Sequence, residues 1–277
     1  MKILLTGANG FIGSHIKKAL ASNHELVTPS HQTLDFNSNI TPEDWIPHLN
    51  GVDAVINAVG IIVEEKKQRF SRLHRDTPST LFQACEQLKI NRVIQISALG
   101  ADENAFTPYQ KSKYQADNVL RNLDVLSFIL RPSLVYGEGG KSFEMFKRLA
   151  KMPLIPFPDG GKQKIQPVHI SDLVLAVKKS LIANQSKTID IVGPKAMTMA
   201  DYIQQIRAAL GKPPAKIISI PMPLIMLSAH LGHYLVPIIH PDNMRMLQQG
   251  NTSDASDLIA FIGQSPRSLK EVLEASS

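Results

Sequence analysis

The stretch that decides the fold is Thr6-Gly7-Ala8-Asn9-Gly10-Phe11-Ile12-Gly13, close to the start of the chain. An apolar run at residues 2–5 precedes it and predicts a buried parallel strand. Residues 14–20 follow it with apolar side chains at helical spacing. A strand that enters a helix through glycines is the arrangement that binds the pyrophosphate of a dinucleotide, because the helix N-terminus faces the anion.

The three glycines of this turn have separate predicted roles. Gly7 permits the tight turn, Gly10 lets the backbone approach the phosphates, and Gly13 lets the helix pack closely on the strand. The spacing is G-x-x-G-x-x-G, which differs from the G-x-G-x-x-G of the common dinucleotide fingerprint. A plain strand-turn-helix that needs glycine only for its geometry is the alternative. The predicted cofactor-binding set also includes the residues between the glycines: Asn9, Phe11 and Ile12.

The same stretch resembles the opening of the extended and atypical short-chain dehydrogenase/reductases, and later stretches extend the resemblance over most of the chain. The resemblance is greatest to the atypical branch that contains the 39-kDa accessory subunit of respiratory complex I and its bacterial relatives. It implies a Rossmann fold and an NAD(P) cofactor. It leaves two functions open, an oxidoreductase or epimerase/dehydratase, and a non-catalytic accessory or regulatory protein that holds NAD(P)H and docks on a partner.

The composition is that of a globular α/β protein. At 277 residues, with 43% hydrophobic and 19% charged residues, the chain can form one large domain with a smaller lobe. Its one cysteine, Cys85, excludes an internal disulfide and fits a reducing compartment, and Met1 leads directly into the first strand, so a cytoplasmic protein is expected. No metal-ligand spacing is present. The net charge of +6 suits an anionic cofactor, but the basic residues are scattered and do not predict nucleic-acid binding.

Strand and helix patterns alternate along the first half of the chain. The predicted strands are residues 25–28, 53–59, 92–97 and 125–131, and the predicted helices are 42–49, 65–88 and 108–121. This alternation predicts an α/β fold with a doubly wound parallel sheet. The predicted dinucleotide-binding domain comprises residues 1–135 and about 168–192, and residues 136–167 and 193–277 form a small C-terminal α/β substrate lobe.

Tyr109 and Lys113 form the second diagnostic motif, since a spacing of four places both on one face of a helix. A nearby ammonium is expected to lower the pKa of the phenol, and the lysine can also hold a ribose hydroxyl. The tyrosine then serves as general acid or base for a carbonyl/alcohol pair beside a nicotinamide. Chance occurrence on an amphipathic helix is the alternative.

The resemblance also implies a catalytic serine after the strand that ends at Ile96. Ser97 is the only hydroxyl there, because Ala98 and Leu99 occupy the positions where the family usually places it. Ser97 is therefore either the catalytic serine or a strand-ending residue that only contacts the cofactor. A missing hydroxyl would weaken reductase chemistry by removing a hydrogen bond to the reacting oxygen.

Loops at the carboxyl ends of the strands are expected to converge on one crevice. Ser30 and His31 follow the second strand where an acid would select NAD, and neither is acidic, so NADP is favoured over NAD. Asp35 and Phe36 are predicted to line the adenine edge. The remaining predicted cofactor contacts are Ala58, Val59, Gly60, Ile96, Ser97, Pro132 and Ser133.

The most apolar stretch, residues 221–239, approaches the length of a membrane span. It contains His230, Gly232, His233 and Pro237, which favours a buried or partner-facing helix. Attachment to a membrane surface, with the protein peripheral to a membrane complex, is the alternative. The small-molecule substrate is not identified by the sequence.

Overall fold

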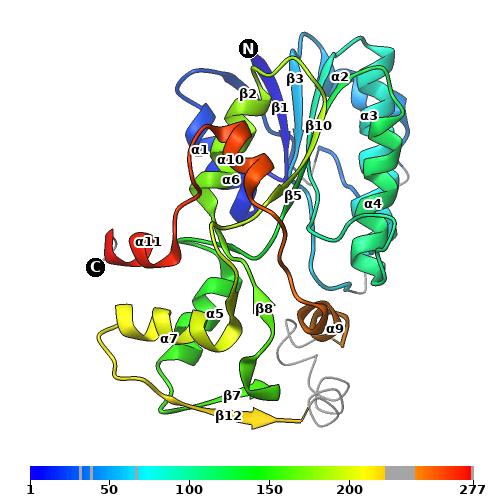
Figure 1. Ribbon diagram of the computed structural model, residues 1–277. Helices are drawn as coiled ribbons and strands as arrows, with labels where there is room; N and C mark the ends of the chain where they lie inside the picture. The colour runs from blue at the N-terminus through cyan, green and yellow to red at the C-terminus, as the bar shows by residue number, and fades with distance from the viewer. Residues whose placement is uncertain (31–32, 38–39, 66–67, 222–240, 276–277) are drawn as a thin grey trace. The chain divides into compact units, whose positions relative to one another are not determined.

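The computed structural model describes residues 1–30, 33–37, 40–65, 68–221 and 241–275. The chain forms two compact units, and both are discontinuous in sequence (Figure 1). Unit 1 comprises Met1–Pro132 and Leu173–Asp190, and unit 2 comprises Ser133–Asp172 and Ile191–Ser277.

Unit 1 is built on a six-stranded sheet with the order β10-β5-β4-β3-β1-β2. The pairs β1–β2, β1–β3, β3–β4 and β4–β5 are parallel, which confirms the predicted doubly wound α/β sheet. The order reverses between β1 and β3, and open α/β sheets bind ligands beyond the carboxyl ends of the strands at such a point. The strands are β1 (Lys2–Thr6), β2 (Glu25–Val27), β3 (Ala54–Asn57), β4 (Arg92–Ile96), β5 (Leu126–Pro132) and β10 (Lys187–Ile191).

Helices cover both faces of this sheet, with α2, α3 and α4 on one side and α1 and α6 on the other (Figure 1). The predicted helices at 42–49 and 108–121 are confirmed, and both begin with a proline at the first turn, where the missing N–H costs nothing. The helices are α1 (Phe11–Leu20), α2 (Pro42–Leu49), α3 (Thr77–Gln87), α4 (Pro108–Arg121) and α6 (Ile170–Ser180).

The helix predicted over 65–88 was wrong at its start. Glu65 and Gln68 form an isolated antiparallel bridge, and helix begins with a π-helical segment, η1 (Ser71–Asp76), which continues into α3. Apolar periodicity does not distinguish an α-helix from a short π-helical segment, because the two differ only in which carbonyl each N–H bonds.

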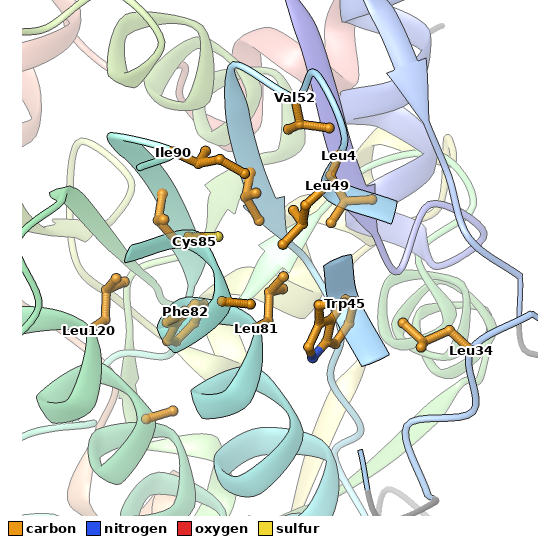
Figure 2. Packing of buried hydrophobic residues seen from close by; sticks show 14 of the residues in the cluster. Leu4, Leu34, Trp45, Leu49, Val52, Leu81, Phe82, Cys85, Ile90 and Leu120 are labelled. Carbon is orange, nitrogen blue, oxygen red and sulfur yellow. The ribbon is translucent and has the colours of Figure 1, made fainter. Parts of the chain in front are cut away.

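The core between the sheet and α2, α3 and α4 is apolar and closed (Figure 2). Leu4 contributes from β1, Trp45 from α2 and Phe82 from α3, and the indole N–H of Trp45 donates to Thr80 Oγ1 at 3.0 Å. Cys85 lies in the same cluster as a free thiol, and burial raises its pKa to about 12. Cys85 is therefore a packing residue with no thiolate at neutral pH.

Unit 2 combines helices with three two-stranded sheets, β8–β11, β7–β12 and β6–β9. Its core lies between α5, α7 and α11, where Phe146 packs edge-on against Tyr202 with ring centroids 5.5 Å apart. The strands are β6 (Val135–Tyr136), β7 (Leu154–Pro158), β8 (Lys164–Ile165), β9 (Val168–His169), β11 (Met197–Thr198) and β12 (Lys216–Ile220). The helices are α5 (Lys141–Ala150), η2 (Asp159–Gly161), α7 (Met199–Ala209), α9 (Pro241–Gln249), α10 (Ser256–Ile262) and α11 (Leu269–Ala275).

The apolar stretch predicted over 221–239 lies, apart from its first residue, outside the described residues. None of the helices in the described part of the chain combines the length and hydropathy that a membrane crossing requires.

Candidate functional site

The turn between β1 and α1 forms a cradle that requires glycine at positions 7 and 13. Gly7 has a φ of +71°, and a Cβ on it would lie 2.7 Å from the backbone carbon of Ala58 in the neighbouring loop. A Cβ on Gly13 would lie 2.0 Å from the carbonyl oxygen of Gly7, so any side chain there would push α1 away from the turn. Gly10 donates its N–H to the same carbonyl at 2.9 Å, which closes the turn.

Gly10 is the N-cap of α1, and no side chain caps this end of the helix. The first N–H groups of any helix have no partner within it, and here no acidic residue stands in the first turn to compete for them. Asn9 and Gly10 are exposed, whereas Phe11 and Ile12 are half-buried. An uncapped helix start in a glycine cradle fits a bound pyrophosphate.

Ser30 lies exposed after β2, in a turn that it forms with Thr33. The Thr33 hydroxyl accepts from Ser30 N–H at 3.0 Å and donates to Ser30 C=O at 2.9 Å. The turn therefore presents a hydroxyl and no carboxylate at the position predicted to meet the adenosine ribose. His31, the other residue predicted there, lies outside the described residues.

Asp35 and Phe36 face different surroundings. The exposed Asp35 carboxylate accepts from the backbone and side-chain N–H groups of Asn37, both at 2.9 Å. The Phe36 ring is buried against Trp45, with ring centroids 5.5 Å apart. Its side chain is thus part of the core, and Asp35 is the polar group of the pair.

A buried ladder of polar side chains joins the ends of β1, β3 and β4. Thr6 Oγ1 donates to Asn57 Oδ1 at 2.6 Å, and Asn57 Nδ2 donates to Gln95 Oε1 at 2.7 Å. Asn57 Oδ1 also accepts from Val59 N–H at 3.3 Å, which fixes the predicted cofactor loop 58–60. Neither Thr6 nor Gln95 had a predicted role, although a polar residue at the end of each of three adjacent parallel strands was a usable signal.

Lys113 is buried and joins the loops that follow β3 and β4. Its ammonium donates to the carbonyl oxygens of Val59 at 3.1 Å and Ile96 at 3.0 Å. Burial lowers the pKa of Lys113 to about 8, and the nearby Asp117 carboxylate opposes this decrease. Two of the three ammonium N–H groups are thus engaged with backbone at the predicted cofactor loops.

Tyr109 stands one turn before Lys113, with its ring edge-on to Phe70 at 5.7 Å and to His74 at 5.4 Å. Burial raises the pKa of Tyr109 to about 12. The expectation that Lys113 lowers this pKa was wrong for the structure as it stands, because the ammonium is directed to the two backbone carbonyls and the phenol lies among aromatic rings. Tyr109 therefore keeps its proton at neutral pH.

His74, in the π-helical segment, is a site residue that the sequence analysis missed. Its Nε2 accepts from Ile61 N–H at 3.0 Å, which leaves the proton of the neutral ring on Nδ1, 3.1 Å from Ser112 Oγ. Burial, together with the Lys113 charge, lowers the pKa of His74 well below 6.5. The neutral imidazole thus holds the loop after residue 60 against α4, and nothing in the local sequence pattern indicated this contact.

Ser97 and Ser133 are two predicted site residues whose hydroxyl groups already donate hydrogen bonds to other protein groups. Ser97 is buried and donates to Asp117 Oδ2 at 2.5 Å. Pro132 ends β5 and accepts from Leu99 N–H at 3.0 Å in unit 1. Ser133 belongs to unit 2, where its hydroxyl donates to Gln166 C=O at 2.6 Å. Unit 1 therefore brings together the glycine cradle, the 58–60 loop, Ile96, Ser97, Tyr109 and Lys113.

A comparison with protein families matches residues 3–192 to the NAD dependent epimerase/dehydratase family. The chain belongs to this family. The match contains the glycine cradle, the 58–60 loop and the Tyr109–Lys113 pair, so it confirms the resemblance proposed from the sequence. The dinucleotide predicted from the cradle is thereby identified as an NAD-type cofactor.

Individual relatives of this family member differ in what they do. The mitochondrial 40 kDa subunit of NADH-ubiquinone oxidoreductase from Neurospora crassa is 25% identical over 58% of this chain and 42% of its own length. A ceramide reductase from Caulobacter vibrioides is 25% identical over 61% of this chain and 57% of its own length. The chain thus spans about half the length of these two relatives.

The fold is shared with a solved dTDP-4-dehydrorhamnose reductase from Bacillus anthracis, crystallised in complex with NADP. The two superpose with a TM-score of 0.74 at 15% identity, covering 99% of this chain and 97% of the other.

Proposed function

We propose that this protein binds a nicotinamide dinucleotide, NADP in preference to NAD, and catalyses hydride transfer between it and a carbonyl or secondary alcohol. The arrangement of Tyr109 and Lys113 on α4 carries this proposal. The Lys113 ammonium contacts the loops after β3 and β4, and the Tyr109 phenol lies one turn earlier on the same helix, against the His74 ring. The exposed Ser30 hydroxyl, with no carboxylate in its turn, supports the preference for a 2′-phosphate.

Each of these residues has a defined part in the reaction. When bound, the nicotinamide ring supplies or accepts the hydride. Tyr109 donates its phenolic proton to the substrate oxygen as the carbonyl becomes an alcohol, and its pKa of about 12 keeps that proton in place at neutral pH. Lys113 holds the two loops with two N–H groups, and its third is available to a ribose hydroxyl. Ser97 is not the donor to the substrate oxygen, because Asp117 already accepts its proton.

We assign the role of substrate lobe to unit 2, with boundaries near those predicted from the sequence. Unit 2 has a pocket of about 540 Å³ that is lined by small and polar groups and contains none of the predicted site residues. Its lining includes Gln166, Lys195, Thr252, Ser253 and Ser256. Pro194 and Ile259 also line the pocket, so it suits a small molecule that has both polar and apolar parts.

Replacing Tyr109 by phenylalanine tests the proposed function. NADPH oxidation is followed with a panel of aldehydes, ketones and keto-sugars, and turnover in Tyr109→Phe should fall roughly 10²- to 10⁴-fold because the proton donor is gone. The dissociation constant for NADPH should stay within about twofold. Tyr114→Phe, which removes a hydroxyl from the same helix, is the matched control and should retain activity.

Two outcomes count against the enzyme. Full turnover in Tyr109→Phe would show that Tyr109 is not the proton donor. Tight NADPH binding with no turnover of any carbonyl in the wild type would instead favour a cofactor-holding accessory protein.

A further inference from the structure

Asp117 lies one turn after Lys113 on the same face of α4. Lys113 Nζ donates to Ile96 C=O at 3.0 Å, and Asp117 Oδ2 accepts from Ser97 Oγ at 2.5 Å. Two side chains of one helix therefore hold two consecutive residues at the end of β4. This contact fixes the register between α4 and the strand whose end carries predicted cofactor residues.

The Asp117 carboxylate is fully buried, and its Oδ1 accepts no hydrogen bond from any residue that the structure describes. A buried carboxylate is costly unless a cation stands near it. The cations that act on it are Lys113 and Arg121 from α4 and Arg131 from β5. Arg131 donates to Asp190 at 2.6 Å, and Arg121 donates to Asn118 at the exposed end of α4. Lys113 is therefore the buried cation of this group that has no other carboxylate partner in the described chain. The His74 ring of η1 also faces Lys113, and it is neutral because its pKa lies well below 6.5.

We propose that Asp117, buried one helical turn from Lys113, is a positioning residue that keeps the Lys113 ammonium charged while the Val59 and Ile96 carbonyls hold it, and so sets the upper pH limit of dinucleotide binding. The inference rests on the proposed function, because it takes Lys113 to meet the cofactor ribose. Burial lowers the pKa of Lys113 to about 8 against the opposing effect of the Asp117 carboxylate, so losing the carboxylate lowers it further. Burial raises the pKa of Asp117 to about 6, against the opposing effects of the Ser97 hydrogen bond and the three cations.

The test measures the dissociation constant for NADPH from pH 6.5 to 9.5. Wild-type affinity should fall above about pH 8, as Lys113 loses its proton. Asp117→Asn keeps the shape of the side chain and an acceptor for Ser97 but removes the charge. The NADPH affinity of this variant should therefore begin to decrease at least about one pH unit lower than that of the wild type. At pH 8.5 this shift corresponds to roughly tenfold weaker binding than in the wild type. Asp124→Asn, which removes an exposed carboxylate just after α4, is the matched control and should leave the midpoint in place.

Lys113→Met separates failure of this inference from failure of the proposed function. If Lys113→Met binds NADPH as tightly as the wild type at every pH, Lys113 does not contact the cofactor. That result contradicts the role given to Lys113 in the proposed function. If Lys113→Met removes the alkaline decrease while Asp117→Asn leaves its midpoint unchanged, Asp117 is not a positioning residue. Thermal unfolding of each variant checks its fold, and Asp117→Ser carries the same expectation should Asp117→Asn not fold. If the wild type loses its affinity for NADPH with a midpoint near pH 10, that result alone overturns the inference.

Discussion

Ser30 is the side chain that we propose selects between NADP and NAD in this protein. It is exposed in the turn after β2, where its neighbour Thr33 also contributes a hydroxyl. Ser30→Asp would place a carboxylate against a 2′-phosphate, and like-charge contacts of this kind cost several kcal/mol. We expect the ratio of NADPH to NADH affinity to fall at least about tenfold, which corresponds to about 1.4 kcal/mol.

Titration of both dinucleotides into wild type and Ser30→Asp measures this ratio. Thr33→Asp, three residues further along the same turn, shows whether a carboxylate elsewhere in the turn changes the ratio of NADPH to NADH affinity as much as Ser30→Asp does. Wild-type protein that already binds NADH tenfold more tightly would show that Ser30 does not select a phosphate.

Residues with local signatures could be predicted from the sequence, and those defined by distant partners could not. Gly7 and Gly13 were found because a strand-turn-helix needs glycine at fixed spacing, and the structure shows what a Cβ would meet there. Asp117 was missed because its partner, Ser97, comes from another element 20 residues away. The raised pKa of Tyr109 was also missed, because a spacing of four says nothing about where the lysine directs its charge.

Among the elements, the π-helical segment η1 contributes most to the site beyond what periodicity predicted. It carries His74, whose ring lies between the loop after residue 60 and α4. π-helical segments often occur at functional sites because their extra residue redirects side chains. Here the redirected side chain is a neutral, buried imidazole.

The buried imidazole gives this segment a predicted pH dependence. The pKa of His74 is well below 6.5 in the folded protein and ordinary in the unfolded chain, so the unfolded state binds more protons below about pH 6.5. The free energy of unfolding should therefore decrease as the pH falls from 6.5 to 5, and more steeply than in a variant without this imidazole. His74→Gln keeps an acceptor for Ile61 N–H and does not titrate, so its stability should depend less on pH over this range.

Denaturant unfolding at pH 5 and pH 7 compares the two proteins. His48→Gln, on α2, controls for the loss of any imidazole. Equal pH dependence in wild type and His74→Gln would show that the ring is not held neutral.

At the scale of the whole molecule, the two units were predictable to different degrees. The parallel sheet of unit 1 followed from alternating apolar strands and amphipathic helices, and its strand order puts the glycine cradle and the 58–60 loop beside the point where the order reverses. The strands of unit 2 are mostly short, two of its sheets being built from pairs of two residues, and such segments have no readable periodicity. The architecture of unit 2 could therefore not be predicted from the sequence.

Gly10 offers the most direct test of the central claim, which is that the cradle of unit 1 binds a dinucleotide. Its backbone is extended, with φ at −76° and ψ at 169°, so a β-branched residue suits it, and an added Cβ would meet only the Gly7 carbonyl, at 3.3 Å. Gly13 is unsuitable, because a Cβ there would clash with backbone at 2.0 Å and disturb the fold itself.

The decisive measurement is calorimetric titration of NADPH and NADH into the wild type and into Gly10→Val, after thermal unfolding has shown that both are folded. The wild type should bind a dinucleotide, and Gly10→Val should lose at least about a hundredfold in affinity, because its side chain occupies the position of the pyrophosphate. Undiminished affinity in folded Gly10→Val, or no binding of either dinucleotide to the wild type, would contradict the claim.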